Sequence, residues 1–252
     1  MDTYIFSLKR WFFICIYSWT LLFLGGEMAS SSVVRQSNDL IQASYKMSLN
    51  EQRLIYIAIS KIPFNEKKEN RTVEITAEEF LAAFPSVGKG NVHIELRKSL
   101  DDLWAREILL SSSQEESKIR WLTSQSRYLQ QSGRLKFSFS PEILPYLENL
   151  KERFTIFHLF DIKNLSTTYA LRIFELLMQF QTTGVVIISL EQCKFRLGLE
   201  DNYKDYRDFK KRIISPSIND INKKTRIKVT FSAKKRGKTV DSLHFFFSEK
   251  VD

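Results

Sequence analysis

The strongest constraint on the fold of this chain is an order of helix and strand patterns that occurs twice. In each half a helix is followed by a short strand, two more helices and a pair of strands. The last strands are also alike, reading GRLKFSFS at residues 133–140 and DSLHFFFS at residues 241–248. A chain of 252 residues is long enough for two ordinary domains, so the repeat predicts two copies of one unit.

Three capping boxes indicate where helices begin. In a capping box, the side chains of the first and fourth residues each accept a hydrogen bond from the other's backbone N–H. The pairs are Ser48 with Glu51, Thr76 with Glu79, and Ser189 with Gln192. They predict helices over residues 48–62, 76–84 and 189–197. Pro85 and Gly198 end the second and third of these helices.

The spacing of apolar residues predicts the remaining helices. Residues 92–104 and 167–180 place apolar side chains three or four positions apart, as in a helix with one buried face. A longer helix runs from about Asp205 to Lys223. Pro216 predicts a bend in it, because proline lacks a backbone N–H.

Short apolar runs and alternating patterns predict strands. The predicted strands cover residues 72–75, 107–112, 117–125, 133–140, 185–189, 226–233 and 243–247. The sequence KKRGK lies between the last two strands, and its Gly237 can adopt the positive φ of a tight hairpin turn.

This order of elements is typical of a winged helix, in which a helix-turn-helix is followed by a β-hairpin, the wing. We therefore predict an α+β fold with two tandem winged-helix domains. The first domain is expected to serve dimerisation or an auxiliary DNA contact, and the second to be the main DNA-binding domain. The predicted divisions are an apolar N-terminal extension at 1–27, an arm at 28–47, the first domain at 48–150 and the second at 151–252.

Positive charge is concentrated in the second half of the chain. The net charge is +9, and residues 1–150 hold 18 basic against 17 acidic residues, whereas residues 151–252 hold 20 against 12. Within residues 204–238 alone there are 13 basic and 3 acidic residues. Such a local surplus indicates a polyanionic partner, although a solvated basic face stays open as the alternative.

The predicted DNA contacts lie on the long helix and on the wing. Long cationic side chains on the exposed helix face can reach bases and phosphates, and arginine can bind guanine with two hydrogen bonds. Cations at a hairpin tip have no role in a core and are well placed for phosphates. The candidates are Arg207, Lys210, Lys211 and Arg212 on the helix, and Lys234, Lys235, Arg236 and Lys238 on the wing.

The first unit offers a weaker candidate interface. Lys89, Arg97 and Lys98 could contact DNA there, but Glu95 and two aspartates dilute the charge of the same helix. A weaker DNA contact and a dimerisation role both stay open for this unit.

Patterns for catalysis and for bound cofactors or metals are missing from the sequence. There is no G-x-x-x-x-G-K-[ST] phosphate loop, and the three histidines are too far apart for the paired metal ligands of a rolling-circle nickase. Cys15 and Cys193 fit neither a disulfide framework nor a metal site, and a reducing cytoplasm suits them best. We expect a binding protein without a cofactor, and not an enzyme.

The apolar run at the N-terminus has three possible explanations. Trp11–Leu24 is 14 residues long, whereas a membrane-spanning helix needs about 20. Basic residues before the run and small residues after it imitate a secretory signal. A membrane tether and an upstream extension of the reading frame, with Met28 as the true start, are the other two explanations.

Three long blocks of the sequence resemble the iteron-binding replication initiators of plasmids, the family of the F-plasmid and π-type initiators. The resemblance covers roughly residues 34–248, and the apolar N-terminus departs from the family pattern. The blocks are QSNDLIQASYKMSLNEQRLIYIAISKI, RFTIFHLFDIKNLSTTYALRIFELL and DFKKRIISPSINDINKKT.

The resemblance implies a function in plasmid replication. Members of this family bind direct repeats in double-stranded DNA at the origin as monomers and help to melt the adjacent A·T-rich DNA. They recruit the host initiator ATPase and the replicative helicase, and chaperones are further expected partners. A dimer, formed through the first domain and in equilibrium with the monomer, commonly represses the initiator's own promoter. A transcriptional repressor without a replication role and a membrane-tethered interaction protein stay open as alternatives.

Overall fold

The structure is a computed structural model that describes most of the chain after residue 31. The described residues are 32–63, 71–88, 90, 92–111, 115–127, 133–148, 150 and 153–250. The apolar extension expected at residues 1–27, with the explanations offered for it, lies outside them, and so does Lys89. No helix within the described ranges is long and apolar enough to cross a membrane.

The winged-helix elements of the first half are the helices α3, α4 and α5 and a three-stranded antiparallel sheet. Their bounds are α3 (Leu49–Ser60), β2 (Thr72–Thr76), α4 (Ala77–Ala83), α5 (Val92–Trp104), β5 (Leu122–Arg127) and β6 (Arg134–Phe139). The strand order is β2-β6-β5, so the short strand pairs with the second strand of the closing hairpin.

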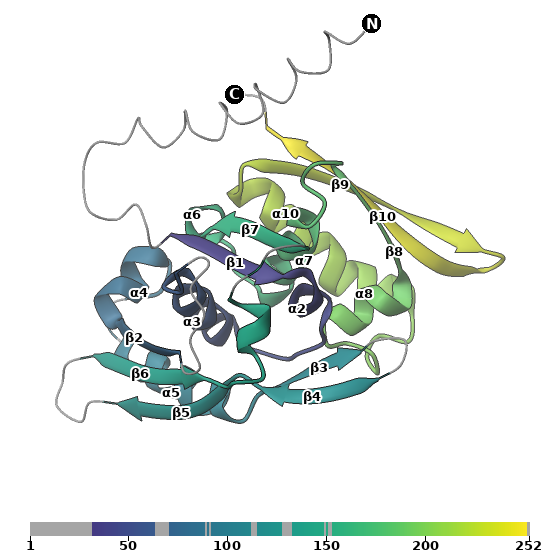
Figure 1. The fold of residues 1–252 in the computed structure, drawn as a ribbon. Coiled ribbons are helices and arrows are strands. Elements are labelled where there is room, and N and C mark those ends of the chain that lie inside the picture. Colours follow the sequence, from purple (N-terminus) through teal and green to yellow (C-terminus); the bar gives the residue numbers. More distant parts are fainter. Residues whose placement is uncertain are drawn as a thin grey trace, which may run out of the picture. The chain divides into compact units, whose positions relative to one another are not determined.

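The second half repeats this arrangement. Its bounds are α7 (Thr168–Met178), β8 (Val185–Ser189), α8 (Leu190–Arg196), α9 (Tyr206–Phe209), a π-helical segment η3 (Lys210–Ile214), α10 (Ser215–Lys224), β9 (Ile227–Arg236) and β10 (Thr239–Glu249). The strand order is β8-β10-β9, which is the order of the first sheet. Each half therefore has the helix-turn-helix and wing that the repeated sequence order predicts (Figure 1).

Two of the three predicted capping boxes have both of their hydrogen bonds, and the third, at α8, has one. Both reciprocal hydrogen bonds of the capping box are present between Ser48 and Glu51 at the start of α3. Both are also present between Thr76 and Glu79 at the start of α4. At α8, the side chain of Ser189 accepts a hydrogen bond from the N–H of Gln192.

The first unit has an additional hairpin, formed by β3 (Glu107–Ser111) and β4 (Glu116–Arg120). The prediction of one strand over residues 117–125 is therefore wrong, because the chain changes partners at Trp121. Before this residue β4 pairs with β3, and after it β5 pairs with β6. Trp121 is 1% exposed and meets Tyr45 edge to face at 5.3 Å, so its burial fixes the corner between the two strands.

Much of the polar arm expected at residues 28–47 forms regular structure within the described residues. It forms β1 (Val33–Ser37), which pairs antiparallel with β7 (Phe154–His158), and then α2 (Asn38–Gln42). Val34 and Leu40 are fully buried, and the side-chain amide of Gln36 donates to the carboxylate of Glu175 inside the protein. The expectation of an arm is wrong because the polar side chains have buried partners that lie far away in the sequence.

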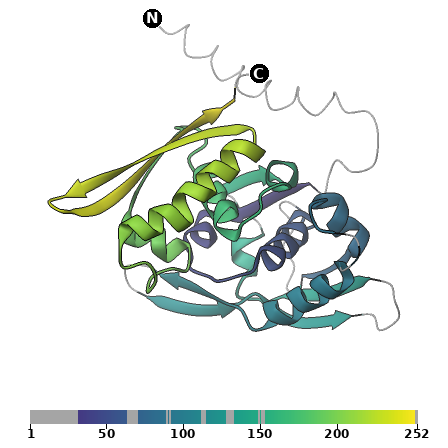
Figure 2. The same cartoon turned by 180° about the vertical axis from the view of Figure 1, so that it is seen from behind.

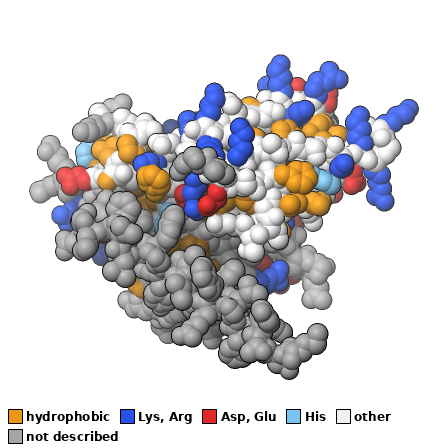
Figure 3. Space-filling model, turned by 90° about the horizontal axis from the view of Figure 1, so that it is seen from above, with side chains coloured by type: hydrophobic (Ala, Val, Ile, Leu, Met, Phe, Trp, Pro, Cys, Tyr) orange, Lys and Arg blue, Asp and Glu red, His pale blue; other side chains and the backbone are white. Residues whose placement is uncertain are grey.

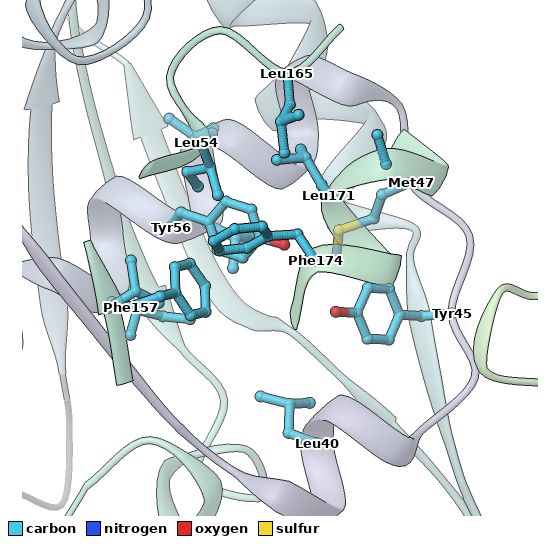
Figure 4. Packing of buried hydrophobic residues seen from close by; sticks show 14 of the residues in the cluster. Leu40, Tyr45, Met47, Leu54, Tyr56, Phe157, Leu165, Leu171 and Phe174 are labelled. Carbon is cyan, nitrogen blue, oxygen red and sulfur yellow. The ribbon is translucent and has the colours of Figure 1, made fainter. Parts of the chain in front are cut away.

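The two halves share one continuous hydrophobic core. In the sequence, the chain passes from β6 of the first half to α7 of the second through a 3₁₀ turn, η2 (Leu144–Tyr146), the strand β7 and a short helix, α6 (Leu159–Ile162). The rings of Tyr56 on α3 and Phe174 on α7 both meet Phe157 on β7 edge to face, at centroid distances of 5.5 and 6.0 Å (Figure 4). The domain division predicted between residues 150 and 151 stays a prediction.

A buried arginine lies at the centre of this shared core. The guanidinium of Arg172 on α7 is ion-paired with Glu175 at 2.7 Å and lies over the ring of Tyr45 at 3.9 Å. It also donates hydrogen bonds to the Tyr45 hydroxyl and to the backbone carbonyls of three further residues. These are Ile41 at 3.1 Å, Ala43 at 2.9 Å and Arg196 at 2.9 Å. Arg172 therefore joins the N-terminal segment and the end of α8 to α7.

The surroundings of Arg172 favour its charged form. Burial by itself lowers the pKa of a guanidinium, but Tyr45 and Glu175 outweigh that effect and raise the pKa of Arg172 above its ordinary value. For the Tyr45 hydroxyl, burial has the opposite effect and raises the pKa, so this group stays protonated. A buried charge is tolerated only when it is paired and its donors are satisfied, and this cluster meets both conditions.

A two-residue turn, Gly237 and Lys238, joins the wing strands β9 and β10. Gly237 has φ +64°, as the sequence predicts, and nothing lies within 4 Å of the place that a Cβ atom would occupy. Backbone conformation alone therefore requires glycine at this position.

Substitution of Arg172 by methionine should lower the free energy of unfolding by about 3–5 kcal/mol, because Glu175 is left buried and uncompensated. Arg134→Met is the matched control, since Arg134 and Glu74 form an exposed pair at 3.4 Å and its loss should cost less than about 1 kcal/mol. Urea unfolding of the full chain measures both values. Equal losses in the two variants would contradict a central role for the Arg172 cluster.

Substitution of Gly237 by alanine should lower the free energy of unfolding by about 1–2 kcal/mol, because alanine is strained at a positive φ. Gly88→Ala provides the control: its position is equally open but has no positive φ, so the change should be within about 0.5 kcal/mol. The same unfolding measurement compares them. A neutral Gly237→Ala would show that the turn conformation is not fixed by this residue.

Candidate nucleic-acid interface

The helix that carries the first group of candidate residues is continuous but irregular. Asp205 caps it by accepting a hydrogen bond from the N–H of Arg207 at 2.8 Å. In η3 the N–H of Ser215 donates to the carbonyl of Lys210, five residues earlier, instead of four. Pro216 explains this change, because it lacks an N–H and its ring would collide with the carbonyl of Arg212. The distortion thus precedes the proline at which the sequence predicts a bend.

This helix separates apolar from cationic side chains. Its apolar side is buried in the core of the second unit through Phe209, Ile213, Ile214, Ile218 and Ile221. The four candidate cations Arg207, Lys210, Lys211 and Arg212 are all exposed. Figure 2 shows the helix crossing the molecule beside the β9–β10 hairpin, with which it is in contact.

The wing presents the second group of candidates. The hairpin of β9 and β10 projects beyond the other described elements (Figures 1 and 2), and Lys and Arg side chains gather at its far end (Figure 3). Along β9, Lys234 and Arg236 lie on one face of the hairpin and Lys235 on the other. Together with Lys238 in the turn they are all exposed, so the tip carries positive charge on both faces.

The helix is joined to the wing by two hydrogen bonds between Asn222 on α10 and Val229 on β9, and by one contact of a candidate cation. The ammonium group of Lys210 lies 5.7 Å from the centre of the Phe231 ring on β9, a distance within the range of a cation–π contact. On the other side of the helix, Lys194 donates to the carbonyl of Tyr203 at 2.6 Å and lies 5.8 Å from the ring of Phe209. The cations of the helix and those of the wing therefore belong to one packed unit.

The eight candidate cations differ from neighbouring cations in whether they form ion pairs with carboxylates. Among the described residues, no carboxylate forms an ion pair with any of the eight. In contrast, Lys224 is paired with Asp220 at 2.7 Å, and Arg226 with Asp161 at 3.0 Å and Glu249 at 2.8 Å. The basic window thus contains paired cations with a structural role and a group whose charge faces solvent.

Three further exposed cations of the basic window have no ion pair among the described residues and were not among the candidates. They are Lys204, Lys223 on α10 and Lys228 on β9. Lys228 lies on the same face of the strand as Lys234, six residues later, a relation that the alternation of the strand would have revealed.

The auxiliary candidates of the first unit are partly described. Arg97 and Lys98 are exposed on α5, and Lys89 is outside the described residues. Glu95 and Asp101 are exposed on the same helix, so the surface of α5 has mixed charge.

Known proteins are similar to this chain in architecture and in sequence. The crystal structure of the Pi initiator protein in complex with iteron DNA matches with a TM-score of 0.75 and 23% identity, over 89% of this chain and all of that one. A replication initiation protein of Escherichia coli is 28% identical over 225 residues, which cover 86% of this chain and 69% of the relative. The PI protein of Escherichia coli is 26% identical over 261 residues, covering 88% and 84% of the two chains.

Two family models match this chain in tandem. The model described as initiator replication protein, WH1, matches residues 33–178, and the model described as initiator Rep protein, WH2, matches residues 189–247. The first match alone covers more than half of the chain. With its two winged-helix units, the chain belongs to the family of initiator replication proteins.

Proposed function

We propose that this chain initiates the replication of a plasmid by binding directly repeated sequences, or iterons, in double-stranded DNA at the origin. The observation that carries the proposal is the group of eight exposed cations, without ion pairs among the described residues, on one helix and the adjoining wing. The relative known as the Pi initiator protein, crystallised with iteron DNA, supports this choice of ligand.

The helix and the wing have different tasks in this proposal. The helix from Tyr206 to Lys224 enters the major groove, where Arg207 and Arg212 read bases and Lys210 and Lys211 bind base edges or phosphates. The wing binds the backbone through Lys234, Lys235, Arg236 and Lys238, which fixes the orientation of the protein on DNA. The second unit, residues 151–252, is then the main DNA-binding domain.

The first unit, residues 48–150, makes an auxiliary DNA contact through Arg97 and Lys98 and carries the surface for dimerisation. The resemblance to iteron-binding initiators supports a monomer that opens the origin and a dimer that represses the initiator's own promoter. It also supports the host initiator ATPase, the replicative helicase and chaperones as partners. We place this activity in the cytoplasm of a prokaryotic host, and we assign the chain a binding role without catalysis.

DNase footprinting of the full chain on its origin tests the choice of DNA site. Protection that recurs at the spacing of the direct repeats is expected. Protection of a single inverted repeat near the promoter, with none at direct repeats, would overturn the proposal in favour of a transcriptional repressor.

Affinity measurements at several salt concentrations test the assigned residues. Lys235→Ala should weaken binding to all DNA sequences and reduce the slope of log K against log salt by about 1, because one phosphate contact is lost. Arg207→Ala should cost about 1–3 kcal/mol and relax the preference for one base. Lys118→Ala is the control, because Lys118 is an exposed lysine on β4 of the first unit and its loss removes the same charge.

An equal effect of the wing substitution and the control substitution on DNA binding would contradict the assignment. If Lys118→Ala reduces affinity and salt slope as much as Lys235→Ala, net charge alone determines binding and the wing has no specific contact.

A further inference from the structure

The sheet of the second unit has one face that no described element covers. Its inner face, with Val186, Leu243 and Phe245, is buried against the helices. On its outer face Ile187 of β8 is 64% exposed and Phe246 of β10 is 46% exposed. Large apolar side chains at this level of exposure, next to each other on one face, are typical of an interaction surface.

The strand register places these side chains together. Residues that are directly opposite in the ladder lie on the same face. The outer face therefore has three rows across β8, β10 and β9: Val185–Phe246–Thr230, Ile187–His244–Ser232 and Ser189–Ser242–Lys234. A fourth row, Ser248–Lys228, adjoins the first. Ile187 and Phe246 are diagonal neighbours in this arrangement, with Val185 and His244 completing the square.

The charges of the face are all of one sign. Lys228 and Lys234 are exposed on β9 at the two ends of the face, six residues apart and thus separated by about 20 Å. No acidic residue occupies any of the four rows. The nearest acidic residues along β10 are Asp241, in the bulge before Ser242, and Glu249, directly after Ser248, where it is ion-paired with Arg226. Figure 3 shows apolar side chains on this side of the molecule with Lys and Arg side chains around them. The outer face thus has an apolar half on β8 and β10 and a cationic half on β9.

We propose that this face binds an amphipathic helix of a partner protein that has acidic residues along one side of its apolar stripe. A helix of about 13 residues spans the distance between Lys228 and Lys234. Laid along β10, it places its apolar stripe on Ile187 and Phe246 and its acidic side chains near the two lysines. DNA does not suit this face, because base and phosphate contacts leave Ile187 and Phe246 without a partner.

A second copy of this chain is a poorer occupant. Two such faces brought together would place Lys228 and Lys234 of each copy near like charges, which is unfavourable. A partner on this face also leaves the DNA-contact helix accessible, because α10 packs on the opposite side of the sheet. Of the proposed DNA contacts, the partner therefore occupies Lys234 on the wing, and it leaves the four cations of the helix free to bind DNA.

The test measures binding of a synthetic peptide to the full chain by fluorescence anisotropy. The probe is a labelled 18-residue helix of leucine, alanine and glutamate, in which leucines form one stripe and glutamates flank it. Its counterpart has lysine at every glutamate position. We expect the acidic probe to bind at least tenfold more tightly than the basic one. No saturable binding of the acidic probe up to 1 mM, or equal binding of both, would overturn the proposal.

Variants of the chain locate the site. The double substitution Ile187→Lys and Phe246→Ser should weaken binding of the acidic probe at least tenfold, while the affinity for origin DNA stays within about twofold. Ile94→Lys on α5 is the matched control, since Ile94 is 67% exposed but lies in the first unit, and it should leave probe binding unchanged. The charge reversal Lys228→Glu with Lys234→Glu should invert the preference in favour of the basic probe.

Two results would refute the assignment of the site. One is unchanged probe binding in the Ile187→Lys, Phe246→Ser variant. The other is self-association of the unmodified chain in sedimentation experiments that this variant abolishes, because the face would then bind a second copy.

Discussion

The buried guanidinium of Arg172 is the interaction on which the rest of the structure depends. It donates hydrogen bonds to the backbone carbonyls of three residues from two distant segments, Ile41 and Ala43 near the N-terminus and Arg196 at the end of α8. These hydrogen bonds hold the segment around Ile41 and the end of α8 in fixed positions against α7. Since α10 packs on α7, which carries Arg172, the position of the helix with the candidate DNA contacts is tied to the same cluster.

Pairing of charge separates structure from function in this protein. The arginines that hold segments together, such as Arg172 and Arg226, have carboxylate partners. The cations of the candidate interface have none among the described residues, so their charge remains available to a polyanion. Basic residues in the same part of the sequence can therefore differ in role. Their ion pairs distinguish the structural cations from the candidate DNA contacts, whereas the amino-acid composition does not.

The two faces of the second sheet differ. One face packs on α10 and holds the helix with the candidate cations against the wing strands. The other exposes Ile187 and Phe246 beside two lysines. The proposed partner face and the helix proposed to contact DNA lie on opposite sides of this sheet.

Local signals in the sequence predicted a large part of the fold and the candidate site. Capping boxes located α3 and α4, alternation located β6 and β9, and Gly237 has the positive φ that its turn requires. Each of these depends on neighbours a few residues away. The errors concern distant partners: the N-terminal segment is a strand because β7 lies beside it, and residues 117–125 are divided because Trp121 is buried. The π-helical segment could not be located from Pro216 alone, because the turn before a proline can adapt in several ways.

The central claim is that this chain initiates replication from direct repeats through the helix and wing of its second unit. The most direct measurement is the maintenance of a plasmid that carries only the origin, in cells that supply the chain from elsewhere. We predict that the plasmid persists with the unmodified chain and is lost when Lys234, Lys235, Arg236 and Lys238 are all replaced by alanine in a chain that still folds. Persistence without the chain, or with the folded wing variant, would contradict the account.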